Sequence, residues 1–465
     1  MTLPRPRGRQ SDVVYLRAAG HLVVLGTAGT GKTVMAMLRA HHLASPSTPG
    51  HGPVLLVTYN NTLVTYLRYL QDRTVKNITV ETYGRFARGY LNSRGQMPQW
   101  GGIATPSQRR ALVQQAVKEV AAERKPSRFF DRDTGFFLDE LEWISGMGLH
   151  SRKEYLESER VGRKTGLDEP QRTAVWRILR TYQRLRGELG VRYDWYDIAT
   201  SVREQLAADP APRRYRHVVI DEGQDLSPEA IRSLVEAADP DGSVTFFGDY
   251  AQQIYGQGIS WRACNLDLRG RPVEWFADNY RNSPEIARLA IAMSRMPLFV
   301  GNPDDLVEPV EPTTAGIPPT LVRCHDEAQE IAIVQSRARA LGRVGSVAVL
   351  ARTWADARRA CRGLKVRKLH PNMPVWDAAP GIYCGAYHSA KGLEFDAVIL
   401  PFSSNTRMPN RDVVEAFGES EAAARESKLL YVAVTRAKTD LIITYSGTLT
   451  TLLPSDPALY QQVTP

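Results

Sequence analysis

Cysteine is scarce in this chain of 465 residues: only four are present, and no two of them form a Cys-x-x-Cys pair. This spacing argues against a disulfide framework and against a zinc site. The sequence also lacks any run of the roughly 18 to 20 apolar residues that a membrane-spanning helix needs. The basic, proline-rich residues 1–9 are not followed by the apolar stretch of a secretion signal. We therefore expect a cytoplasmic protein with no membrane partner.

The composition is that of an ordinary globular protein, with 43% hydrophobic and 23% charged residues. At this length the chain is expected to form two to four domains. The net charge is +9 and the isoelectric point is near 9.3. Such a balance suits a polyanionic partner, because lysine and arginine release counterions from a phosphate backbone. Charge alone is a weak signal, since many arginine-rich proteins bind no nucleic acid.

Short apolar runs alternate with helical stretches in two parts of the chain. Strands are expected at residues 22–25, 54–57, 78–80, 217–220, 244–247, 320–323, 347–350, 382–387, 397–400 and 441–445. Alternation of this kind predicts parallel sheets covered by helices on both faces. Residues 105–207 instead show long helical periodicity, which predicts a mostly helical insertion. The expected organisation is a first α/β domain made of residues 1–104 and 208–275, this insertion, and a second α/β domain made of residues 276–465.

A glycine-rich loop follows the first expected strand. Residues 26–33 fit the pattern G-x-x-x-x-G-K-[ST] in full and stand between an expected strand and an expected helix. In such a loop, backbone N–H groups surround phosphates, Lys32 neutralises the β and γ oxygens, and Thr33 binds Mg²⁺. The expected nucleotide contacts from this loop are Gly26, Thr27, Ala28, Gly29, Thr30, Gly31, Lys32 and Thr33.

An acidic pair follows the expected strand at 217–220. Parallel strands place such residues at the edge of the sheet where ligands bind. Asp221 can hold Mg²⁺, and Glu222 can accept a proton from an attacking water. An acidic pair after a strand is often only a solvated loop, but a phosphate loop in the same domain favours hydrolysis of a nucleoside triphosphate.

Residues 218–227 read Val-Val-Ile-Asp-Glu-Gly-Gln-Asp-Leu-Ser, and the segment resembles the DExQD motif of the UvrD, Rep and PcrA group of superfamily 1 helicases. Further segments resemble motifs of this family in the same order, namely Gly248–Tyr255, Asn279–Arg281, Tyr387–Phe395 and Leu430–Lys438. The resemblance implies two RecA-like P-loop domains with parallel sheets and a mostly helical 1B-like insertion in the first. It also implies ATP and Mg²⁺ as cofactors.

The resemblance assigns roles at the nucleotide. It implies that Gln10 reads the adenine edge and that Tyr280 stacks on adenine. Gln252 is then the sensor of the γ-phosphate. Arg281 and Arg436 supply two guanidinium groups from the second domain. Lys32, Asp221, Glu222, Gln252, Arg281 and Arg436 are the expected catalytic residues, and Gln10, Tyr280 and Glu394 are expected to bind the nucleotide together with the loop.

The resemblance also implies a path for single-stranded DNA, with RNA as an alternative. The expected strand contacts are Tyr59, Asn60, Thr82, Tyr83, Tyr255, Trp261, His388 and Ser389. Stacking of bases on aromatic rings contributes roughly 1–3 kcal/mol per base and tolerates any sequence. For Tyr59, Tyr83 and Trp261, packing in a core or interface is the competing interpretation.

Two departures from the family pattern affect these expectations. Val34 stands where the family often has an arginine that covers adenine, which leaves base selectivity to Gln10 and Tyr280. Only 106 residues separate Arg281 from His388, too few for the family's large 2B insertion. The hypothesis is an ATP-dependent translocase or helicase that moves 3′ to 5′. The alternatives are a regulatory or defence-system motor subunit that signals to a partner nuclease or repair factor, and a degenerate nucleotide-binding scaffold.

Overall fold

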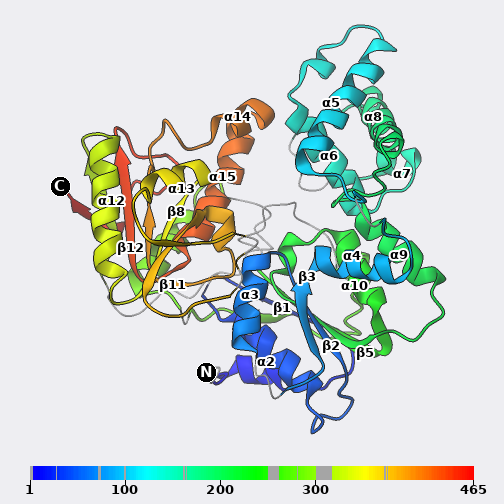
Figure 1. The fold of residues 1–465 in the computed structure, drawn as a ribbon, viewed down its shortest axis with the longest axis horizontal. Coiled ribbons are helices and arrows are strands. Elements are labelled where there is room, and N and C mark those ends of the chain that lie inside the picture. The colour runs from blue at the N-terminus through cyan, green and yellow to red at the C-terminus, as the bar shows by residue number, and fades with distance from the viewer. Residues whose placement is uncertain are drawn as a thin grey trace.

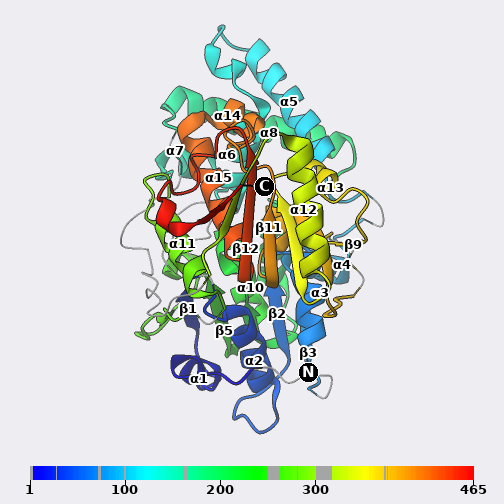
Figure 2. The ribbon, with the colours of Figure 1, turned by 90° about the vertical axis from the view of Figure 1, so that its left-hand side faces the viewer.

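The chain forms two α/β halves and a helical insertion, as Figures 1 and 2 show. The computed structural model describes residues 4–27, 29–71, 75–98, 101–160, 163, 165–249, 261–279, 281–299, 317–370, 373 and 375–464. Within these residues, no helix combines the length and the apolar character needed to cross a membrane.

The first half contains a six-stranded sheet in the order β3-β2-β4-β5-β1-β6, and all its strand pairs are parallel. Its strands are β1 (Leu22–Gly26), β2 (Val54–Thr58), β3 (Ile78–Thr82), β4 (Tyr215–Ile220), β5 (Ala238–Gly248) and β6 (Glu274–Phe276). Its helices are α1 (Arg9–Val14), α2 (Lys32–Ala44), α3 (Asn61–Leu70), α4 (Tyr83–Ser93), α9 (Ile198–Ala208) and α10 (Pro228–Ala237).

Both faces of this first sheet are buried. In β1, Leu22 and Val24 pack in one apolar core with α2 and α3. Val23 and Leu25 point the other way, into a second core with α4, α9 and α10. Because successive side chains of a strand face opposite sides, a strand buried on both faces reads as an unbroken apolar run. This is why these strands were visible in the sequence.

The helical insertion rises from the edge of the first sheet where β3 ends (Figure 1). It is built from α5 (Pro106–Ala122), α6 (Thr134–Met147), α7 (Arg152–Glu157) and α8 (Glu169–Glu188). Thr105 and Asp168 begin α5 and α8 with capping boxes, in which side chains satisfy free backbone N–H groups. These helices enclose an apolar core of their own. Helix α9 lies within the expected insertion range 105–207 but packs in the core of the first half.

The second half contains a seven-stranded sheet in the order β13-β7-β12-β11-β8-β10-β9, again with every strand pair parallel. Its strands are β7 (Thr320–Cys324), β8 (Ser346–Ala351), β9 (Val366–Lys368), β10 (Gly381–Ala386), β11 (Phe395–Leu400), β12 (Ala437–Ser446) and β13 (Gln461–Val463). Its helices are α11 (Pro284–Ser294), α12 (Glu327–Leu341), α13 (Trp354–Ala360), α14 (Arg411–Phe417) and α15 (Glu419–Val434). The expected fold of two parallel-sheet α/β units is confirmed. The expected division at residue 275 falls just before the last residue of β6.

Helix α3 of the first half packs directly against the second half. The ring of Tyr66 meets Trp376 edge-on, with 5.1 Å between ring centroids. The Thr65 hydroxyl donates to the carbonyl oxygen of Met373 at 3.3 Å. A Cβ atom added to Gly392 would collide with the side chain of Leu63. The two halves are therefore in close contact along the edge that carries the glycine-rich loop and the acidic pair.

Candidate active site

The glycine-rich loop joins β1 to α2 and forms a tight cradle. Gly29 and Gly31 have φ values of 84° and 80°, in the left-handed region that glycine adopts without strain. The Lys32 ammonium lies inside the loop and donates to the carbonyl oxygens of Gly26 at 2.8 Å and Thr27 at 2.6 Å. Burial lowers the pKa of Lys32, although the charge of Asp249, whose carboxylate lies 3.5 Å from the ammonium, opposes that effect.

Gln10 of α1 contacts the same loop. Its side-chain amide donates to the carbonyl oxygen of Thr30 at 3.0 Å, and its side-chain oxygen accepts from the backbone N–H of Arg7 at 3.1 Å. The side chain is buried and lies close to Gly31. Gln10 thus holds the shape of the loop, and its expected contact with adenine stays a prediction.

The acidic pair lies at the carboxyl end of β4 and is buried. Among the described residues, neither carboxylate oxygen of Asp221 has a hydrogen-bond partner. Burial raises the pKa of Asp221, and the charge of neighbouring Glu222 adds to the effect, while Thr33 opposes it. A buried carboxylate without a partner is costly unless a cation or a donor satisfies it. Mg²⁺ commonly binds through one or two protein oxygens plus substrate phosphates, so Asp221 and Thr33 fit such an ion.

Glu222 is held in an unusual conformation with φ of 54°. Its carboxylate accepts a hydrogen bond from the side-chain amide of Gln224 at 2.5 Å. The side-chain oxygen of Gln224 in turn accepts from the backbone N–H of Asp249 at 2.9 Å. Burial would raise the pKa of Glu222, but the positive charges of Lys391, Lys32 and Arg436 outweigh burial and lower it. A charged and oriented carboxylate is suited to accept a proton from water.

Two arginines of the second half reach this pocket. Arg436 follows α15, is buried, and donates to the carbonyl oxygens of Val432 at 2.8 Å and Leu393 at 3.2 Å. Burial and the charge of Arg281 lower the pKa of Arg436 to about 10, and Glu222 and Asp249 oppose them. Both arginines therefore lie within electrostatic range of the first half's charged groups. This is the arrangement on which the sequence interpretation depended.

Asn279 and Asn282 pack against the glycine-rich loop. A Cβ atom on Gly29 would collide with the side chain of Asn279. Asn282 donates to the carbonyl oxygens of Thr435 at 3.2 Å and Ala437 at 2.5 Å, which ties this asparagine to the residues beside Arg436. Arg281 donates to the Glu394 carboxylate at 2.7 Å.

Glu394 also pairs with Lys438, whose ammonium lies 3.2 Å away. Glu394 therefore positions Arg281, and its expected contact with the nucleotide stays a prediction.

The family models match this chain over most of its length. Residues 8–268 match the UvrD/REP helicase N-terminal domain, and residues 379–448 match the UvrD-like helicase C-terminal domain. The chain belongs to the UvrD-like helicase family. The expected resemblance is confirmed, and so is the expectation of two RecA-like α/β domains. Members of this family are ATP-dependent DNA helicases.

Individual relatives are distant. The chain is 25% identical to the putative ATP-dependent DNA helicase YjcD of Bacillus subtilis over 290 residues, which covers 58% of this chain and 36% of that protein. It is 26% identical to the ATP-dependent DNA helicase UvrD2 of Mycobacterium tuberculosis over 560 residues, 94% of this chain and 78% of that protein. It is 42% identical to the DNA helicase II of Rickettsia typhi over 59 residues, 13% of this chain and 9% of that protein. This chain thus spans little more than a third of YjcD but most of UvrD2.

A buried ion pair lies between the expected ATP site of this UvrD-like chain and residues that are expected to contact nucleic acid. The Lys391 ammonium donates to the Asp225 carboxylate at 2.6 Å, and both side chains are almost fully buried. Asp225 belongs to the DExQD segment of the first half, and Lys391 follows η6 (Tyr387–Ala390) of the second half. The side chain of Asn60 donates to the carbonyl oxygen of Lys391 at 3.0 Å.

The residues expected to contact single-stranded DNA differ in their exposure to solvent. Tyr59 is 48% exposed at the end of β2, and His388 is also exposed. Ser389 and Thr82 are buried, and Thr82 caps α4 by accepting from the backbone N–H of Arg85. Tyr59 and His388 are thus exposed to solvent, and whether they bind a ligand stays a prediction.

Two expected aromatic contacts are packed inside the protein. Tyr83 is buried, and its hydroxyl lies 2.8 Å from the Ser233 hydroxyl. Trp261, in η4 (Trp261–Cys264), is partly buried and packs edge-on against Phe246 with ring centroids 4.9 Å apart. Their surroundings favour the packing interpretation that the sequence left open. Ala28, Gln252, Tyr255 and Tyr280 lie outside the described residues.

Sequence reasoning gave no role to Gln224, Lys391 or Trp195. Gln224 and Lys391 stand inside recognised motifs, but only the fold shows what each of them contacts. Trp195 is 45% exposed and lies against Gly84 at the start of α4, with 2.9 Å between its ring and a Cβ atom added there. The run Tyr193–Tyr196, where the chain returns from the insertion, was the available signal.

Proposed function

We propose that this chain is an ATP-dependent translocase that moves 3′ to 5′ along single-stranded DNA. The observation that carries the proposal is electrostatic contact across the halves, in which the charge of Arg281 acts on Lys32 and the charge of Arg436 acts on Glu222. Guanidinium groups supplied across a domain boundary stabilise the charge that develops in phosphoryl transfer. Hydrolysis can then alternately close and open the boundary, which is the motion that a motor requires.

The hydrolytic step is assigned to the following groups. Glu222, oriented by Gln224, accepts a proton from the attacking water, whose oxygen bonds to the γ-phosphorus as the bond to the leaving ADP oxygen breaks. Lys32 and the two arginines stabilise the negative charge on the phosphate oxygens. Asp221 and Thr33 would hold Mg²⁺, which would supply positive charge against the negative phosphate oxygens.

The Lys391–Asp225 pair supports coupling between ATP and DNA. Asp225 is separated from the general base Glu222 by only two residues. Lys391 contacts Asn60, next to the exposed Tyr59, and lies three residues beyond the exposed His388. A strand that displaces η6 or the β2–α3 junction therefore acts on the segment that holds the general base. The pathway runs through packed groups of two domains, which can carry energetic coupling between distant sites.

Two measurements on the full chain test the proposal. ATP hydrolysis is measured without nucleic acid, with single-stranded DNA and with single-stranded RNA of equal length. Strand displacement is measured on duplexes with a 3′ or a 5′ tail. Stimulation by DNA and displacement from the 3′ tail support the proposal. A hydrolysis rate that no nucleic acid changes would overturn it.

The short segment between Arg281 and His388 favours one alternative outcome. Without the family's 2B insertion, the chain would hydrolyse ATP on DNA yet displace a strand weakly by itself. DNA-stimulated hydrolysis without displacement by the isolated chain would favour a motor subunit that acts through a partner nuclease or repair factor. A preference for RNA over DNA in the same assay would change the assigned substrate.

A further inference from the structure

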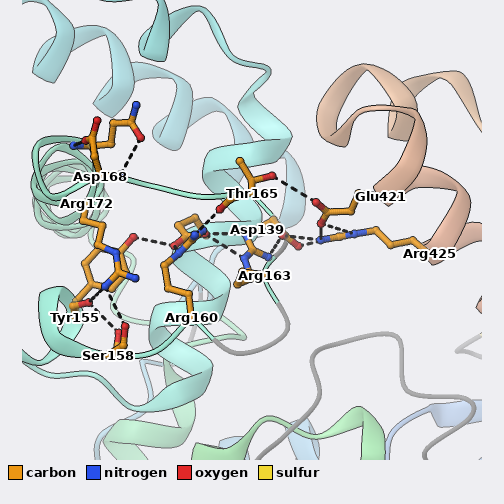
Figure 3. Close-up of polar contacts among 12 residues, drawn as sticks. Asp139, Tyr155, Ser158, Arg160, Arg163, Thr165, Asp168, Arg172, Glu421 and Arg425 are labelled. Carbon is orange, nitrogen blue, oxygen red and sulfur yellow. Dashed lines mark hydrogen bonds and ion pairs between the residues drawn. The ribbon is translucent and has the colours of Figure 1, made fainter. Parts of the chain in front are cut away.

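The insertion and the second half are joined by a network of charged side chains, shown in Figure 3. The Arg425 guanidinium, on α15, donates to both carboxylate oxygens of Asp139, on α6, at 3.1 and 2.9 Å. Two parallel hydrogen bonds of this kind are strong and directional. Close by, the Thr165 hydroxyl lies 3.5 Å from the Glu421 carboxylate. The start of α6 also approaches α14, since a Cβ atom on Gly135 would lie 3.3 Å from that of Ala416.

Each side of this contact keeps a partner of its own. Arg163 pairs with Asp139 inside the insertion and with Glu140 at 2.8 Å. Arg425 pairs with Glu421 of its own helix at 2.7 Å. A buried charge without a partner would be strongly destabilising. Separating Arg425 from Asp139 leaves neither side chain in that state, because each keeps another ion-pair partner. The contact can therefore break without leaving an unpaired charge on either side.

Asp139 is ionised when the contact forms. Burial would raise its pKa, but the hydrogen bonds and charges of Arg425 and Arg163 outweigh burial and lower it. The Arg425 guanidinium also lies over the ring of Phe417, with 3.9 Å to the centroid. The ring and the paired carboxylates fix the arginine in one orientation, which reduces the entropy lost on contact.

Helix α15 connects this contact to the ATP site. Arg425 is the seventh of the 16 residues of this helix, and Arg436 lies two residues beyond its end. At 1.5 Å per residue, Arg425 is about 14 Å along the helix from its last residue, Val434. A rigid helix of this length can transmit a movement of Arg436 to Arg425.

The three parts of the molecule contact one another in pairs. The insertion is continuous with the first half, the Lys391–Asp225 pair joins the first half to the second, and the Arg425–Asp139 pair joins the second half to the insertion. Figure 1 shows the insertion above α4, α9 and α10 of the first half, with α15 running from the side of the insertion towards the first half.

We propose that the Arg425–Asp139 pair is a reversible latch that closes the protein into a ring around the bound strand. The inference rests on the proposed function, because it needs a strand at the junction of the halves. With the latch closed, single-stranded DNA enters or leaves only by its end. With the latch open, it binds and dissociates sideways. The chain thereby stays bound to the same DNA strand through each ATP cycle without the 2B insertion.

Crosslinking tests whether a ring exists. Asp139→Cys and Arg425→Cys are introduced together and joined with a short bismaleimide, since the four native cysteines are buried. Crosslinking before DNA is added is expected to abolish binding of circular single-stranded DNA and to leave linear DNA bound. Crosslinking after binding is expected to hold the circle through a salt wash. Equal binding of circular and linear single-stranded DNA by the crosslinked protein would overturn the proposal.

A second variant tests the latch without a crosslinking reagent. Arg425→Ala is expected to release circular DNA about tenfold faster than the parent, a difference of about 1.4 kcal/mol in the barrier to release. Arg184→Ala is the matched control, because its exposed pairs with Glu119 and Glu188 lie wholly within the insertion. Equal release rates for Arg425→Ala and the parent would show that this pair does not retain the DNA.

The same experiments separate this inference from the proposed function. If DNA fails to stimulate ATP hydrolysis by the parent, the proposed function is wrong and no ring around a track exists. If DNA stimulates hydrolysis but the crosslinked protein still binds circles, only the ring is wrong.

Discussion

The Lys391 ammonium lies 2.6 Å from the Asp225 carboxylate, and this buried pair joins the two α/β halves three residues along the chain from Glu222, the proposed general base. Truncating one partner of a buried pair leaves the other charge unpaired, which typically costs roughly 3–5 kcal/mol. Replacing both partners with neutral groups of similar size avoids that cost.

We therefore expect Lys391→Met to lower the free energy of unfolding by about 3 kcal/mol or more, and Lys391→Met with Asp225→Asn to restore most of it. Chemical denaturation measures both. The double variant should fold and still lose the stimulation of ATP hydrolysis by DNA. If the double variant is stimulated like the parent, the pair does not couple the sites.

Glu222→Gln should reduce ATP turnover by about 10²–10⁴-fold, because the amide cannot accept the proton from water. Affinity for ATP should be kept, since Lys32 and the glycine-rich loop are unchanged. Stopped-flow binding of a fluorescent ATP analogue and steady-state hydrolysis give the two quantities. Glu119→Gln, an exposed carboxylate of the insertion, is the control. Hydrolysis by Glu222→Gln at the parental rate would show that another group is the base.

Stimulation by DNA should depend on pH through Asp225. Burial raises the pKa of this carboxyl group to about 6, although Lys391 opposes the shift. Because the folded pKa lies above the ordinary value of 3.8, protonated Asp225 favours the folded state, and its contribution to stability is lost as pH rises through about 6. Protonation also removes the charge that binds Lys391.

The ratio of DNA-stimulated to basal hydrolysis should therefore fall as the pH is lowered from about 7 to about 5. Glu222 stays ionised over this range, because its pKa is lowered. Hydrolysis measured with and without DNA across these pH values gives the ratio. In Asp225→Asn the ratio should be low at every pH, and a parental pH profile in that variant would argue against this assignment.

Tyr59→Ala should weaken binding to single-stranded DNA by a factor that corresponds to one lost stacking contact, roughly 1–3 kcal/mol. Fluorescence anisotropy of labelled oligonucleotides measures the affinity. Tyr83→Phe is the matched aromatic control, since that ring is buried and only its hydroxyl bond to Ser233 is lost. Equal loss in both variants would point to a general change of fold rather than to stacking.

The strands, the glycine-rich loop and the acidic pair were predictable because each depends on neighbouring residues. A strand buried on both faces is an apolar run; Asp221 follows such a run directly, and the glycine-rich loop that carries Lys32 begins where another ends. Arg281 and Arg436 carry no local signal of that kind, and they were found only through the resemblance of whole motifs.

The contacts between distant segments could not be predicted. Lys391 and Asp225 are 166 residues apart, and Arg425 and Asp139 are 286 apart. No periodicity or composition brings such pairs together, because the packing of the two halves and the insertion against one another decides where they meet. For the same reason the sequence left open whether Tyr83 binds a strand or fills the core.

The pocket shared between the halves is tested most directly by the rate of ATP hydrolysis in Arg436→Lys with saturating single-stranded DNA. Lysine keeps the positive charge but loses the planar donor geometry of arginine. We expect a fall of about a hundredfold or more in kcat, as for other arginines supplied across a domain boundary, with ATP still bound. Hydrolysis at the parental rate would show that the second half does not complete the site.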